Sequence, residues 1–87
     1  MKILAIKDIV RKDVPIYYRR LYSGIASLEL NTKTADYRID FSIEHKPTGE
    51  KLITLTFIDH IDYPIIPLNK ELKAFINSLD TNGDLPD

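Results

Sequence analysis

The clearest pattern in the chain is a strict alternation of apolar and polar residues between positions 35 and 45. Such alternation is typical of a β-strand with one buried face. Residues 51–59 repeat the pattern, and the loop between the two segments holds the proline and glycine that a tight connection favours. The two segments therefore predict a hairpin with apolar residues facing one another: Ile43 with Ile53, Phe41 with Leu55, and Ile39 with Phe57.

The segment from Pro15 to Tyr22 predicts another strand, rich in tyrosine and arginine. Ser23-Gly24 is interpreted as a two-residue hairpin turn, because glycine accepts the positive φ that such turns require. This turn pairs residues 15–22 with residues 25–30 and sends Arg19 to the core face. There Arg19 is either held by an acidic partner or lies near a sheet edge with its stem on apolar surface. The opposite, open face receives Tyr18, Arg20 and Tyr22.

Two further elements complete the pattern. Residues 2–10 are apolar with both strand-like and helix-like spacing, and their β-branched content favours a strand. Residues 67–80 carry a single apolar stripe at helical spacing, with Pro67 in the first turn and Gly83 as a stop. The stripe consists of Leu68, Leu72, Phe75, Ile76 and Leu79.

These elements predict an α+β protein: a four- to five-stranded, mostly antiparallel β-meander with one C-terminal helix packed on one face. We expect one domain over residues 1–87, because 87 residues build one modest core. The sheet spans residues 2–59, an apolar proline-rich connection spans 60–66, the helix spans 67–80, and a frayed acidic tail spans 81–87. The connection either wraps the sheet edge or meets a second subunit.

Composition narrows the class of protein without naming its activity. The net charge is -1, with residues 1–30 basic and residues 31–87 acidic, which is too slight an asymmetry to indicate a nucleic-acid-binding domain by itself. The chain has no cysteine, which excludes disulfides and thiolate metal sites and fits a cytoplasmic protein. No apolar run reaches the roughly 20 residues of a membrane span, so no membrane association is expected.

The candidate binding residues lie on the predicted open face and in the connection. They are Tyr18, Arg20, Tyr22, Arg38, Leu52, Ile58 and Tyr63. Aromatic and guanidinium groups can anchor a protein partner or stack on bases. The alternative interpretation is a solvated face on which Arg20 and Arg38 pair across strands with Glu29, Asp40 or Glu44.

The leading functional hypothesis is a non-catalytic interaction module that self-associates, preferably as a dimer, or binds another protein. The first alternative is a nucleic-acid-binding accessory protein that uses the Tyr/Arg strand with Lys7, Arg11 and Lys12. The second is a small enzyme or ligand-binding protein, for which Asp59, His60 and Asp62 would have to converge in a cleft. No catalytic motif, cofactor or metal site is expected, since His45 and His60 fall at opposite ends of the predicted hairpin.

Overall fold

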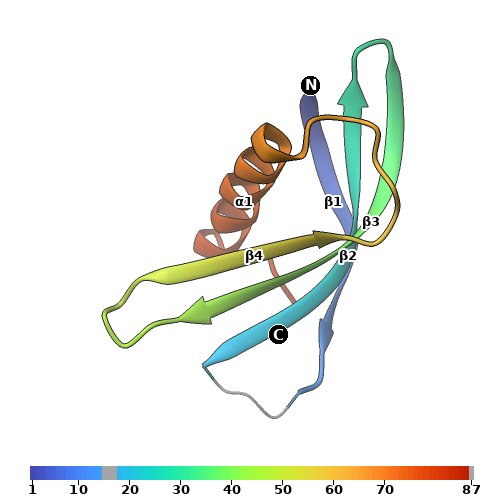
Figure 1. The fold of residues 1–87 in the computed structure, drawn as a ribbon. Helices are drawn as coiled ribbons and strands as arrows, with labels where there is room; N and C mark the ends of the chain where they lie inside the picture. The colour runs from blue at the N-terminus through green and yellow to red at the C-terminus, as the bar shows by residue number, and fades with distance from the viewer. Residues whose placement is uncertain (15–17, 87) are drawn as a thin grey trace.

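The computed structural model describes residues 1–14 and 18–86. In this part of the chain, four strands are followed by one helix: β1 (Lys2–Lys12), β2 (Arg19–Leu30), β3 (Lys33–His45), β4 (Lys51–Phe57) and α1 (Ile65–Thr81). The strands form one antiparallel sheet in the order β1-β2-β3-β4. The strongly twisted sheet carries α1 on one side (Figure 1). The predicted fold class, an antiparallel meander with a C-terminal helix on one face, is confirmed.

The hairpin of β3 and β4 has the predicted register. Phe41 lies opposite Leu55, and the pairs on either side follow without a shift. The turn between the strands is closed by a hydrogen bond from the Lys46 N–H to the Glu50 C=O, and Gly49 adopts a φ of 93° there. Alternation and turn chemistry agreed in this segment, and a slip of one residue would have exposed every apolar side chain.

The predicted turn at Ser23-Gly24 is wrong. β2 runs without interruption through both residues, and the chain instead turns at Asn31 and Thr32 to pair β2 with β3. Removing the turn exchanges the two faces of the segment before it, because side chains alternate along a continuous strand. Tyr22 therefore lies opposite Phe41 in the core rather than on the open face. The first residues of the predicted strand, 15–17, lie outside the described residues.

Gly24 serves close packing rather than a turn. A Cβ atom built on Gly24 would lie 3.1 Å from Ile6 Cγ2 and 3.3 Å from the Lys7 carbonyl oxygen, both on the neighbouring β1. A side chain larger than alanine has no room at this crossing.

We expect Gly24→Val to destabilise the protein by about 1–3 kcal/mol, as overpacked cores do. Urea unfolding of the variant measures the change. Gly49→Val is the steric control, because a Cβ on Gly49 meets no atom within 4 Å and any cost there comes from its positive φ. A fully stable Gly24→Val protein would contradict the close approach of β1.

β1 is a strand, as its β-branched content predicted, but two bulges interrupt it. The register shifts between Ile3 and Ala5 and again between Lys7 and Val10, where Asp8 has a φ of 52°. Each bulge reverses which side chains face the helix, so Ile3, Ile6 and Ile9 all pack against the core at a spacing of three. The bulges explain why the sequence showed both strand-like and helix-like periods.

The core lies between the sheet and α1. The helix begins two residues before the predicted start at residue 67 and ends one residue after the predicted end at residue 80. Its fully buried residues are Leu68, Leu72 and Ile76, while Phe75 and Leu79 of the predicted stripe are partly exposed. Ile61, in the proline-rich connection, is also buried, and Tyr63 packs against the core. The connection therefore covers one end of the sheet.

Candidate functional site

The structure does not bring the predicted binding residues together on one face. Tyr22 is buried, with 1% of its surface exposed, and Arg20 occupies the same side of β2. Tyr18 precedes β2, and Tyr63 packs on the core. Arg38, Leu52 and Ile58 are exposed as expected. The placement of Arg20 and Tyr22 on the open face is wrong, because it depended on the turn at Ser23-Gly24.

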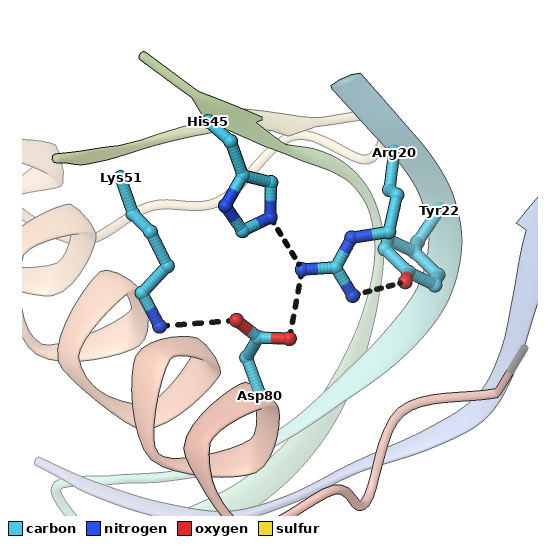
Figure 2. Close-up of polar contacts among 5 residues, drawn as sticks. All are labelled: Arg20, Tyr22, His45, Lys51 and Asp80. Atoms are coloured by element: carbon cyan, nitrogen blue, oxygen red, sulfur yellow. Dashed lines mark hydrogen bonds and ion pairs between the residues drawn. The ribbon is translucent and has the colours of Figure 1, made fainter. Parts of the chain in front are cut away.

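Arg20 belongs to a polar cluster that connects β2 to the end of α1 (Figure 2). Its Nη2 atom donates to Asp80 Oδ1 at 2.9 Å, and its Nη1 atom donates to the Tyr22 hydroxyl at 3.2 Å. Lys51 Nζ donates to the other Asp80 oxygen at 3.0 Å. His45 Nε2 lies 3.0 Å from Arg20 Nη2 and accepts a hydrogen bond, because a guanidinium can only donate.

The electrostatics of this cluster favour the charged form of Asp80. Burial raises the pKa of Asp80, but the hydrogen bonds from Lys51 and Arg20 outweigh it, and the pKa lies below its ordinary value. Burial likewise disfavours the charged form of Arg20, but its contacts with Asp80 and Tyr22 raise its pKa overall. Both partners therefore stay ionised near neutral pH. The cluster is self-contained and holds the helix to the sheet.

Ion pairs also cover much of the open face. Lys7 pairs with Asp36 at 2.9 Å, and Lys12 pairs with Asp40 at 3.0 Å. Arg19, expected on the core face, instead lies on this face with Nη2 2.7 Å from Glu44. The solvated-face interpretation was thus right about pairing but wrong about the partners.

Arg38 pairs with neither of the acidic residues expected for it. Its guanidinium binds Asp59, and the same carboxylate accepts the Arg38 backbone N–H at 2.9 Å. The hydrogen bonds from the Arg38 side chain and backbone lower the pKa of Asp59. Asp59 thereby extends the edge of β3 beyond the end of β4. Because this carboxylate is committed to Arg38, it does not form an acid–base group with His60.

An apolar corner forms where β4 ends and α1 begins, and we define it by Ile58, Ile65 and Ile66. These side chains are 50%, 40% and 84% exposed, respectively. Beside them lies a hollow of about 440 Å³ whose walls include Phe57, Ile58, Ile61 and Ile65. Gathered exposed aliphatic side chains mark interaction sites more often than scattered ones do. The apolar corner is the best candidate for a binding surface.

Sequence reasoning found only part of this corner. Ile58 was among the candidates, but Ile65 and Ile66 were treated as part of the connection. Their signal was available: Ile66 falls outside the buried stripe of Leu68, Leu72 and Ile76. An isoleucine off the apolar stripe of a short amphipathic helix has no core to enter.

The fold and these sites define a small α+β protein in which a four-stranded antiparallel meander carries one helix. A protein-family model matches residues 1–81, and the chain belongs to that family, whose description names no activity or ligand. No curated protein and no solved structure matches the chain. In the described part of the chain, no helix is long and apolar enough to cross a membrane.

Proposed function

We propose that this protein is a non-catalytic interaction module that self-associates as a homodimer and acts in the cytoplasm. The observation that carries the proposal is the apolar corner, above all Ile66, which leaves 84% of its surface exposed. Three isoleucines gathered beside a hollow are costly to keep in water and gain free energy when a partner covers them. The absence of cysteine fits the reducing cytoplasm.

The polar groups support a binding role rather than a catalytic one. Asp36, Asp40, Glu44, Asp59 and Asp80 each hold a cationic side chain in an ion pair. A general acid or base needs a proton-transfer group that is available to a substrate. Carboxylates engaged in this way stabilise the fold and leave little for acid–base chemistry.

The nucleic-acid hypothesis is the weaker alternative. Tyr22 is buried and stacks on Phe41, so it is unavailable for a base. Lys7, Lys12 and Arg20 each have an acidic partner. Phosphate binding would have to displace those carboxylates, and a net charge of -1 gives no general attraction to a polyanion.

We expect Ile66→Lys to weaken self-association at least tenfold while leaving the fold intact. The side chain is almost fully exposed in the single chain, so the change mainly affects whatever covers it. Light scattering coupled to size-exclusion chromatography over a range of concentrations measures the dissociation. Asn77→Lys, at an exposed position of the same helix, is the control for the added charge. Equal association of the two variants would remove the apolar corner from the interface.

A further inference from the structure

β4 has a strand neighbour on only one side. The Ile58 N–H donates to the Arg38 C=O at 2.9 Å, and the Lys46 N–H donates to the Glu50 C=O at 2.9 Å. In an antiparallel pair, the direction of backbone bonding alternates from residue to residue. The even-numbered residues of β4 therefore bond to β3. The N–H and C=O groups of Lys51, Ile53, Leu55 and Phe57 point away from the sheet.

The two edges of the sheet differ in how they are protected. β1 carries two bulges, a residue with positive φ at Asp8, and several lysine and arginine side chains. Bulges and charges of this kind prevent an edge from pairing with another strand. β4 pairs in unbroken register, contains no proline, and has its one charge at its first residue, Lys51. β4 is the edge that remains open to strand addition.

The sequence of β4 fits a second copy of itself in antiparallel orientation. Full overlap of Lys51–Phe57 with the same segment places Thr54 opposite the partner's Thr54. Ile53 then lies opposite the partner's Leu55, so residues with outward backbone groups face one another. Threonine pairs and apolar pairs are both favourable across antiparallel strands. No like charges fall directly opposite one another within the seven residues.

Charge at the two ends of β4 also selects the antiparallel arrangement. Residues 46–51 carry two lysines and one glutamate, whereas residues 59–62 carry Asp59 and Asp62 with His60. Antiparallel pairing places the basic start of each strand beside the acidic end of the other. Parallel pairing would place the acidic ends together, which costs free energy.

We propose that two copies of this chain pair through β4, antiparallel, with Thr54 on the two-fold axis. The two four-stranded sheets then form one continuous sheet, and both helices lie on the same face. The apolar corner follows each end of the shared ladder, beside the turn at residues 46–50 of the other copy. This proposal rests on the proposed self-association and adds its partner surface and register.

Single cysteine variants test the register, because the natural chain has no cysteine. Directly opposed residues without mutual hydrogen bonds have Cα atoms about 4.5 Å apart, which is within disulfide range. Thr54→Cys should therefore form a covalent dimer under mild oxidation. Thr56→Cys is the matched control: both threonines are exposed on the same face of β4. The Thr56 positions of the two copies would lie about 13 Å apart, four residues along the strand.

We expect Thr54→Cys to form disulfide-linked dimer at least tenfold faster than Thr56→Cys on non-reducing gels, with circular dichroism under reducing conditions verifying both folds. Equal rates, or no cross-linking of Thr54→Cys, would overturn the pairing of β4. If wild-type protein is dimeric by light scattering in that case, self-association stands and uses another surface. A monomer at every concentration overturns both proposals and leaves a strand of another protein as the occupant of this edge.

Discussion

Tyr22→Ala is expected to destabilise the protein by about 3–5 kcal/mol, the range for removing a large aromatic side chain from a core. The Tyr22 ring is buried and stacks on Phe41, with ring centroids 5.1 Å apart and an interplanar angle of 18°. Phe41→Ala should cost a similar amount. Losses of this size approach the whole stability of a small domain. Urea unfolding followed by circular dichroism measures both variants.

Tyr18→Ala is the control for the loss of a tyrosine. Tyr18 is 53% exposed, so its removal should change the free energy of unfolding by no more than about 1 kcal/mol. The double variant of Tyr22 and Phe41 should show a coupling of about 0.5–1.5 kcal/mol, as stacked aromatic pairs do. If Tyr18→Ala proved more damaging than Tyr22→Ala, the continuous course of β2 through Ser23 and Gly24 would be wrong.

Asp80→Asn should lower the free energy of unfolding by about 1–3 kcal/mol, because it leaves two cations without their shared anion. Asp80 accepts hydrogen bonds from both Arg20 and Lys51, and its side chain is 13% exposed. The contact joins the last turn of α1 to β2 and β4, so its loss should loosen the helix end. Asp84→Asn, at an exposed position beyond the helix, is the matched control.

The same pair of proteins gives a pH dependence whose sign follows from the pKa of Asp80. This pKa is lower in the folded protein than in the unfolded chain. The carboxylate therefore stabilises the fold fully above its unfolded pKa of about 4, and this contribution disappears as the pH falls through the folded pKa. The difference in stability between wild type and Asp80→Asn should be largest near pH 7 and shrink below about pH 4. A difference that grew toward acid pH would contradict the assignment.

The sequence predicted most reliably where two local signals agreed. In the β3–β4 hairpin, alternation and the turn residues Pro47 and Gly49 supported one register, and the structure has that register. In β2, only Gly24 suggested a turn, and a glycine inside a strand can equally mark a close approach of another backbone. The sequence contains no sign of which reason applies, since the approaching atoms belong to β1.

The candidate site was predictable only in part for the same reason. Ile58 was found from strand alternation, and the burial of Leu68, Leu72 and Ile76 was found from helical spacing. Asp80 was treated as a helix end, because its partners Arg20 and Lys51 lie 60 and 29 residues away in the chain. Ion pairs over such separations leave no local pattern.

By itself, the amino-acid sequence determined the fold class, the β3–β4 register and the buried stripe of the helix, because each depends on side-chain periodicity within a short segment. Tertiary structure alone decided which face of β2 is buried, where β1 bulges, and which cations surround Asp80. Those features depend on the distance between strands that are remote in the chain. The exposure of Ile66 was decided at the same level, since an isoleucine becomes a binding surface only when the folded core leaves it outside.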